Sequence, residues 1–276
     1  MNAEPFFVVS SGRSGTAMLH KALSQAPGVE MHHEYMVHII QPLAVKRYLG
    51  LVTENDAYGI LRDTYVAAVH YCDGSHWGDS SNKVSWLIPE LAALLPKAKF
   101  VYLARDGRKV ASSYFHKLNN ECYDDRSTAI LRAFLDDPAN HPAPPPEKKY
   151  WWPIPLKADP VSKIFADFDQ FQRIAWHWAE INRVIMSSLE KLPPSQSHFA
   201  RLEDLRTSSQ SVHRLYDFLN LPYKDEYFAM FARPHNVNKP EDRLLDEKQR
   251  SQFHDIASEM MTRLGYASKD EYVVNY

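Results

Sequence analysis

The amino-terminal segment places the strongest constraint on how this chain can fold. Residues 6–9 are an apolar, partly β-branched run, residues 11–15 form a turn with two glycines, and a helical pattern with Leu19 and Leu23 follows. A buried strand, a glycine turn and a helix start form a frame for binding phosphate. The N–H groups of the turn and the positive end of the helix dipole point at the same anion. The segment predicts an α/β fold with an anion site at this turn.

The residues of the turn indicate which kind of phosphate-bearing ligand it can bind. Gly12 and Gly15 let the backbone approach a ligand closely, and Arg13 adds a planar positive charge. Loops that bind nucleoside triphosphates end in Gly-Lys-Ser or Gly-Lys-Thr, and this turn has no lysine. The pattern favours a phosphate-bearing donor other than ATP. The alternative is an ordinary turn between a strand and a helix.

A second segment points to another phosphate contact. Residues 100–104 are apolar without alternation, as in a buried strand of a parallel sheet, and Arg105 follows directly. Ser113 stands eight residues after Arg105, inside a predicted helix that starts near residue 110. Arginine offers two N–H groups to phosphate oxygens and serine offers a hydroxyl. In the alternative interpretation, Arg105 pairs with Asp106 or caps the strand.

Together the two segments resemble the PAPS-dependent sulfotransferase family, bacterial type, whose donor is 3′-phosphoadenosine 5′-phosphosulfate (PAPS) and whose product is PAP. The resemblance implies that the first turn binds the 5′-phosphosulfate and that Arg105 and Ser113 bind the 3′-phosphate. It implies no metal. The donor-binding residues that it implies in these segments are Gly12, Arg13, Ser14, Gly15, Thr16, Ala17, Arg105 and Ser113.

Further segments match the family in order, from about residue 5 to residue 266. Residues 87–100 resemble the helix and turn before the arginine strand, and residues 199–205 resemble a later strand. Arg233 and Asn236 precede the closing helix and are implied to cover the 3′-phosphate, although a solvent-facing loop is the alternative. Met18 and Leu202 stand where animal cytosolic members have Trp and Tyr, so the residues that stack on adenine stay open.

Composition agrees with one α/β domain over residues 1–276. Short apolar strands alternate with amphipathic helices, which predicts a P-loop-like central parallel sheet flanked by helices. We expect the strands at 6–9 and 100–104 to lie close, with their carboxyl ends forming one crevice. The formal net charge of -2 argues against a nucleic-acid partner. No apolar run is long enough to span a bilayer, and the chain enters its first strand at once, so we expect a cytoplasmic protein.

Residues 118–165 interrupt this alternation. The segment contains five prolines between residues 138 and 146, and then the aromatic run Tyr150, Trp151 and Trp152. Prolines exclude a continuous helix there, yet such large apolar groups are rarely left in water. The insertion is either a lid over an apolar acceptor pocket or a surface loop that packs on the core. The apolar stripe of the following helix, residues 168–189, is predicted to be core.

The catalytic base must come from the cluster Glu30, His32, His33, Glu34 and His38. Related families with Arg-Ser-Gly-Thr in the loop use a Glu about twenty residues after that Arg, and Glu34 stands twenty-one residues after Arg13. Glu34 is the first candidate and His33 the second, while Arg13 is expected to stabilise the leaving oxygen. A zinc site built on His32 with Glu34 or His38 is a weaker alternative, because no Cys/His pair with zinc spacing stands elsewhere.

The sequence therefore predicts transfer of a sulfuryl group from PAPS to a hydroxyl or amine acceptor, a small molecule or a carbohydrate. A P-loop kinase-like enzyme and a catalytically inactive nucleotide-binding protein are the alternatives. The acceptor, including a protein acceptor, and the oligomeric state stay open.

Overall fold

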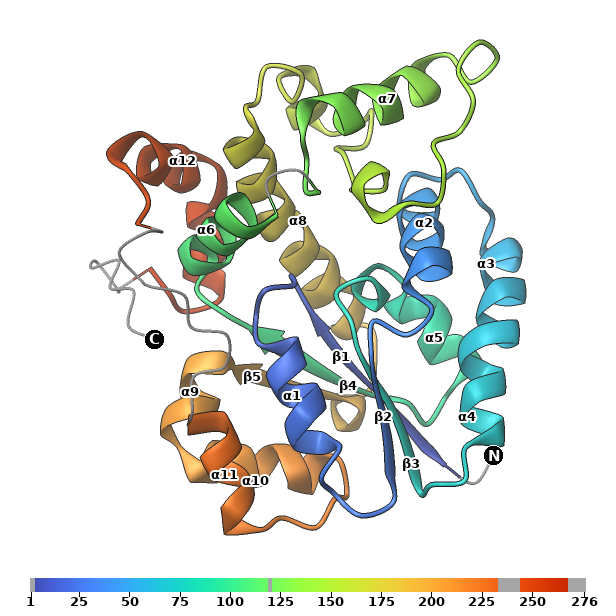
Figure 1. Ribbon diagram of the computed structural model, residues 1–276, viewed down its shortest axis with the longest axis vertical. Coiled ribbons are helices and arrows are strands. Elements are labelled where there is room, and N and C mark those ends of the chain that lie inside the picture. Colours follow the sequence, from blue (N-terminus) through green and yellow to red (C-terminus); the bar gives the residue numbers. More distant parts are fainter. Residues whose placement is uncertain (1–2, 119–120, 233–243, 268–276) are drawn as a thin grey trace.

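A five-stranded parallel sheet forms the centre of the computed structural model, which describes residues 3–118, 121–232 and 244–267 (Figure 1). The strand order is β2-β3-β1-β4-β5, and each neighbouring pair is parallel. The strands are β1 (Glu4–Ser10), β2 (Val29–His33), β3 (His76–Ser80), β4 (Lys99–Ala104) and β5 (Ser197–Arg201). The predicted α/β class with a central parallel sheet is confirmed.

Helices cover both faces of the sheet (Figure 1). The α-helices are α1 (Thr16–Leu23), α2 (Val37–Tyr48), α3 (Glu54–Leu61), α4 (Ala67–Tyr71), α5 (Ile88–Leu94), α6 (Gly107–Lys117), α7 (Asp125–Asp136), α8 (Gln170–Leu189), α9 (Leu202–Thr207), α10 (Ser209–Phe218), α11 (Asp225–Ala232) and α12 (Glu247–Arg263). Shorter turns are the π-helical η1 (Arg62–Val66) and the 3₁₀ turns η2 (Val84–Trp86), η3 (Lys148–Tyr150), η4 (Pro160–Lys163) and η5 (Pro194–Gln196).

The buried sheet explains why the strand sequences are apolar throughout. Successive side chains of a strand point to opposite faces. Phe7 and Val9 of β1 therefore pack in one core cluster with residues of α5, α8 and α12, while Phe6 and Val8 pack in another with α1, α10 and α11. Both faces need apolar residues, so no polar alternation appears. The predicted stripe on α8 is buried as expected, at Phe171, Ile174, Ala175, Trp178, Ile181 and Ile185.

The strand order creates a crevice at the carboxyl end of β1. β1 and β4 are neighbours, but the chain crosses from β1 to β2 on one side of the sheet and from β4 to β5 on the other, so the two connections diverge between these strands. Open α/β sheets bind ligands at such a point. The register of β1 with β4 sets Ser10 opposite Leu103, which brings the turn after β1 next to Arg105. The predicted proximity of the two strands is confirmed.

The insertion packs on the protein through its aromatic residues, and it also contains α7, which the sequence did not predict. Trp151 is 1% exposed, and its Nε1 donates to the carbonyl of Pro145 (2.8 Å). Gln41 of α2 donates to the carbonyls of Lys148 (2.9 Å) and Trp151 (2.7 Å). The backbone around residues 148–151 is thus fixed to α2 while neighbouring side chains reach the crevice.

We expect Trp151→Ala to lower the free energy of unfolding by about 3–5 kcal/mol, because it removes a fully buried ring and leaves a cavity. Urea denaturation measures this loss. Leu156→Ala is the matched control in the same insertion, since Leu156 is 38% exposed and its truncation should cost less than about 1 kcal/mol. Equal small losses for the two variants would contradict the packing described here.

Within residues 3–118, 121–232 and 244–267, no helix has the length and apolar character that crossing a membrane requires.

Candidate functional site

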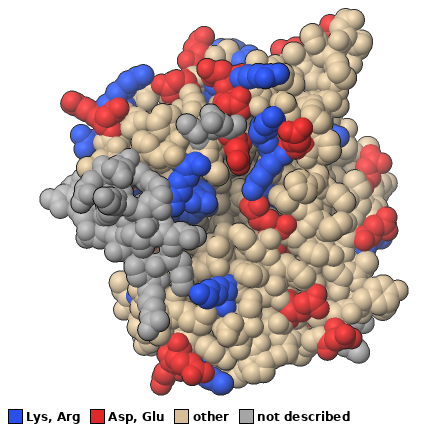
Figure 2. All heavy atoms as spheres, viewed as in Figure 1, with Lys and Arg blue, Asp and Glu red and all other residues tan. Residues whose placement is uncertain are grey.

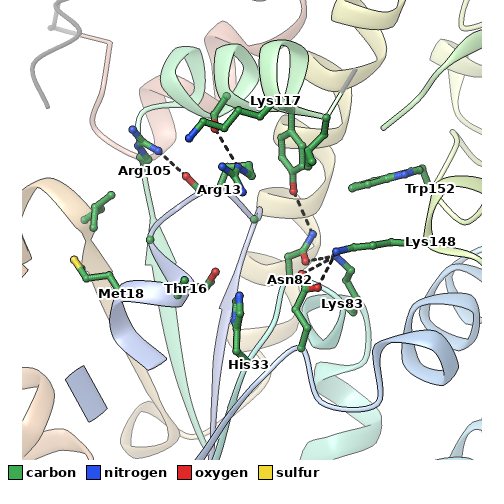
Figure 3. A pocket seen from close by; sticks show the side chains of 18 of the residues that line it. Arg13, Thr16, Met18, His33, Asn82, Lys83, Arg105, Lys117, Lys148 and Trp152 are labelled. Carbon is green, nitrogen blue, oxygen red and sulfur yellow. Dashed lines mark hydrogen bonds and ion pairs between the residues drawn. The ribbon is translucent and has the colours of Figure 1, made fainter. Parts of the chain in front are cut away.

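A cavity of about 200 Å³ opens at the carboxyl ends of β1, β2 and β4 (Figure 3). In the space-filling view, Lys and Arg side chains lie on two sides of the hollow on this face (Figure 2). The residues that line the cavity come from the turn after β1, the start of α1, the carboxyl ends of β2, β3 and β4 with the residues that follow them, α6, the insertion and α9. They are Gly12, Arg13, Gly15, Thr16, Ala17, Met18, His33, Glu34, Asn82, Lys83, Arg105, Ser113, Tyr114, Lys117, Leu118, Lys148, Trp152, Leu202 and Arg206.

The turn after β1 requires its two glycines. Gly12 has φ +78°, and a Cβ added there would lie 2.0 Å from Oη of Tyr114. Gly15 has φ +97°, and a Cβ there would lie 2.7 Å from a methyl carbon of Leu202. These φ values lie in the left-handed region, which side chains other than glycine rarely adopt. Gly15 also precedes α1 without a capping side chain, so the helix start is open to the cavity.

The carbonyl groups of this turn accept hydrogen bonds from side chains of the protein. Tyr114 Oη donates to the carbonyl of Ser11 (2.9 Å), Ser14 Oγ donates to that of Gly12 (3.0 Å), and Arg105 Nη1 donates to that of Arg13 (2.7 Å). With three successive carbonyls held this way, the turn has acceptors that are already occupied and favours an anion in the cavity. Ser14 is buried in this role and, unlike the other predicted donor-binding residues of the turn, does not line the cavity.

The two predicted phosphate-binding segments meet at Arg13. Its Nε donates to Oγ of Ser113 (3.0 Å), while its carbonyl accepts from Arg105. Ser113 reaches this position because Asp106 caps α6, where its carboxylate accepts from N–H of Arg108 (3.0 Å). Asp106 also forms an ion pair with Arg108 (2.8 Å). Arg105 donates to the carbonyl of Arg13, so the structure shows this contact in place of the alternative pairing of Arg105 with Asp106.

Glu34, the residue after β2, forms ion pairs with two lysines, Lys83 and Lys148, which Figure 3 labels. Lys83 Nζ donates to Oε1 (3.1 Å), and Lys148 Nζ donates to Oε2 (2.8 Å). Burial would raise the pKa of Glu34, but the two ammonium groups outweigh it and lower that pKa to about 2. The carboxylate is therefore ionised throughout the physiological range.

Lys83 is the more deeply held of the two lysines. Its side chain is 6% exposed, Nζ also donates to Oδ1 of Asn82 (2.6 Å), and the ring of Trp152 lies 5.5 Å away. Burial lowers the pKa of Lys83 to about 8, although Glu34 opposes this shift. The pairing thus favours the charged form of Glu34, while burial works against the charge on Lys83. The desolvation of Lys83 therefore offsets part of the stabilisation that the ion pair provides.

His33 presents a free acceptor to the cavity. Its Nδ1 lies 2.8 Å from the carbonyl oxygen of Ser80, and a carbonyl can only accept, so Nδ1 carries the proton. In the neutral ring, Nε2 then has a lone pair. The ring of His32 packs against Trp77 and Tyr35. Across the described ranges, no group of three His, Cys, Asp or Glu side chains is placed to hold a metal ion, and the zinc alternative gains no support there.

The cavity contains residues that the sequence did not single out, namely Asn82, Lys83, Tyr114, Lys117, Lys148, Trp152 and Arg206. A signal existed for Lys83, because the polar run 80–83 directly follows a buried strand, as Arg105 does. Lys148 had no such signal. Met18 and Leu202, noted as departures, both line the cavity. Arg233 and Asn236 lie outside the described residues.

Comparisons with known proteins give one family match over part of the chain and one fold. The sulfotransferase family model matches residues 5–137. A sulfotransferase domain from the curacin biosynthetic pathway superposes with a TM-score of 0.52 at 15% identity and covers 94% of this chain and 98% of its own. A sulfotransferase from Alicyclobacillus acidocaldarius superposes with a TM-score of 0.54 at 14% identity and covers 98% of this chain and 97% of its own. One from Mycobacterium avium superposes with a TM-score of 0.56 at 11% identity and covers 95% of this chain and 77% of its own. No curated protein sequence matches the chain.

Proposed function

We propose that this chain transfers a sulfuryl group from PAPS to a hydroxyl or amine acceptor, because residues 5–137 match the sulfotransferase family model and the chain has the fold of solved sulfotransferases. One observation carries the choice of donor. The glycine turn, Arg105 and Ser113 line a single cavity, where they can bind two separate phosphate groups of one molecule.

The charge of the cavity suits this donor. Six basic residues and one acidic residue, Glu34, are among the described residues that line it. The basic residues are Arg13, Lys83, Arg105, Lys117, Lys148 and Arg206. PAPS carries a 3′-phosphate and a 5′-phosphosulfate, so its negative charges match an excess of positive groups. In this arrangement the turn and the start of α1 bind the 5′-phosphosulfate, while Arg105 and Ser113 bind the 3′-phosphate.

The proposed reaction is an in-line displacement at sulfur. The acceptor oxygen forms the new S–O bond as the bond from sulfur to the 5′-phosphate oxygen breaks and PAP leaves. Arg13 stabilises the negative charge that grows on the leaving oxygen. Glu34 takes the proton of the acceptor hydroxyl, and His33 is the alternative base because its Nε2 is an acceptor. Trp152 and Leu118 border the cavity and offer apolar contact to an acceptor, a small molecule or a carbohydrate.

We expect PAP to raise the melting temperature more than ATP–Mg²⁺ or adenosine 5′-phosphate does. At one hundred times its Kd, a ligand adds about 2.7 kcal/mol to the free energy of unfolding. Adenosine 5′-phosphate is the matched control, since it differs from PAP only in lacking the 3′-phosphate. Preference for ATP–Mg²⁺ would indicate the kinase-like alternative. PAP binding without sulfuryl transfer to any acceptor class would indicate an inactive nucleotide-binding protein.

A further inference from the structure

The two lysines that hold Glu34 differ in their freedom to move. Lys83 is buried and is held by Glu34, by Asn82 and by the ring of Trp152. The side chain of Lys148 is 35% exposed and comes from the insertion. Its backbone carbonyl is fixed by Gln41 (2.9 Å), so a displacement of the ammonium group needs only side-chain rotation. Lys148 is therefore the lysine that can leave Glu34.

The ion pairs oppose the chemistry that Glu34 is proposed to perform. A general base works best when its pKa lies near the operating pH, and a carboxylate between two ammonium groups has a weak affinity for protons. Releasing one lysine would strengthen the base. Apart from the two lysines and Glu34, the ionisable residues that line the cavity are Arg13 in the turn, His33 on β2, Arg105 after β4, Tyr114 and Lys117 on α6, and Arg206 on α9. The ion pairs that the described structure shows for Glu34 are those with Lys83 and Lys148.

An anion entering the cavity offers Lys148 another partner. The sulfonate of the donor must lie between the turn and the base, since the acceptor attacks sulfur while Glu34 removes its proton. Glu34, Lys83 and Lys148 all line the cavity that the donor would enter, and Figure 3 shows the side chains of the two lysines converging there.

We propose that Lys148 is a positioning residue which holds Glu34 in the free enzyme and turns to the sulfonate of the bound donor, so that the carboxylate is released when the donor is in place. This inference depends on the proposed function. It gives the insertion a defined part in the reaction, because a segment that is packed on α2 controls the charge around the base. It also makes the base competent only after the donor has bound.

Lys148→Gln tests the proposal, with Lys149→Gln as the matched control. Lys149 is the next residue of the same turn and pairs with Glu147, away from Glu34. Carbon-13 NMR of glutamate carboxyl groups reports the titration of Glu34 directly, and Glu34→Gln assigns its signal. In the free protein we expect Lys148→Gln to raise the pKa of Glu34 by about one unit or more, whereas Lys149→Gln leaves it as in the wild type.

Steady-state kinetics supply the second measurement. Losing the contact with the sulfonate should raise KM for PAPS roughly tenfold, while kcat falls less than about threefold, because Lys148 has already left Glu34 in the reacting complex. An unchanged Glu34 titration in Lys148→Gln overturns the proposal. A kcat loss above about a hundredfold overturns it as well, since Lys148 would then act on the reacting atoms.

Calorimetry with PAP on the same samples separates this inference from the proposed function. If PAP binds neither the wild type nor the variant, the donor assignment fails, and the NMR titration still decides whether Lys148 controls Glu34. If PAP binds both equally and only the titration and KM differ, the effect is confined to the sulfonate side, as proposed.

Discussion

Replacing Glu34 with Gln should lower kcat by roughly 10²–10⁴-fold, because the amide keeps the shape of the side chain but cannot accept the proton of the acceptor hydroxyl. PAP affinity should not fall, since Glu34 is the one acidic group among six basic residues in the described lining of the cavity. Turnover with PAPS at saturating acceptor and calorimetry with PAP measure the two effects separately.

Two control variants test whether the loss of turnover is specific to Glu34. Glu30→Gln changes another carboxylate of β2, which pairs with His32 (2.9 Å) outside the cavity, and should leave turnover close to wild type. His33→Ala should cost much less than Glu34→Gln. If the Gln variant turns over normally and the His33 variant is inactive, Nε2 of His33 is the base. The assignment of Glu34 from its twenty-one-residue spacing to Arg13 is then wrong.

Arg105→Ala should weaken PAPS binding by about 2–4 kcal/mol, or roughly 30- to 1000-fold in Kd, because it removes the proposed charge-assisted contact with the 3′-phosphate. Adenosine 5′-phosphosulfate lacks that phosphate, so its affinity should change far less. The comparison is needed because Arg105 also donates to the carbonyl of Arg13 (2.7 Å) and so stabilises the turn.

The pattern of losses identifies the role of Arg105. A loss through the turn alone would affect both ligands equally, since both carry the 5′-phosphosulfate. Arg214→Ala is the control for charge, because Arg214 is exposed on α10 and bonds to Ser211 (3.1 Å). A loss of affinity in this control would indicate long-range electrostatics in place of a direct contact.

The part of the site that we propose to bind the donor could be predicted because its signals are local in sequence. Residues 6–19 and 100–113 each contain a strand, a turn and a helix start, and the rules for parallel sheets bring their carboxyl ends to one edge. The sequence and these rules therefore predict that Arg13, Arg105 and Ser113 lie close together. The glycines also followed, although the tyrosine that excludes a side chain at Gly12 did not.

The acceptor side could not be predicted in the same way. Lys148 lies 114 residues from Glu34 in a proline-rich segment without periodicity, so no spacing relates the two. The sequence did identify the crowded segment around Glu34, but not that its charge is set by two lysines. Whether the insertion is a lid or a surface loop also had no answer in sequence, and it packs on the core while contributing Lys148 and Trp152 to the cavity.

The occupied carbonyls of the turn have a consequence for the thermodynamics of donor binding. Because Tyr114, Ser14 and Arg105 fix residues 11–13 in the free protein, the conformational entropy of this turn is lost during folding and not on binding. The donor then meets a rigid anion receptor. Its association should be a single fast phase with a rate that rises linearly with concentration, without the plateau that a loop-ordering step would impose.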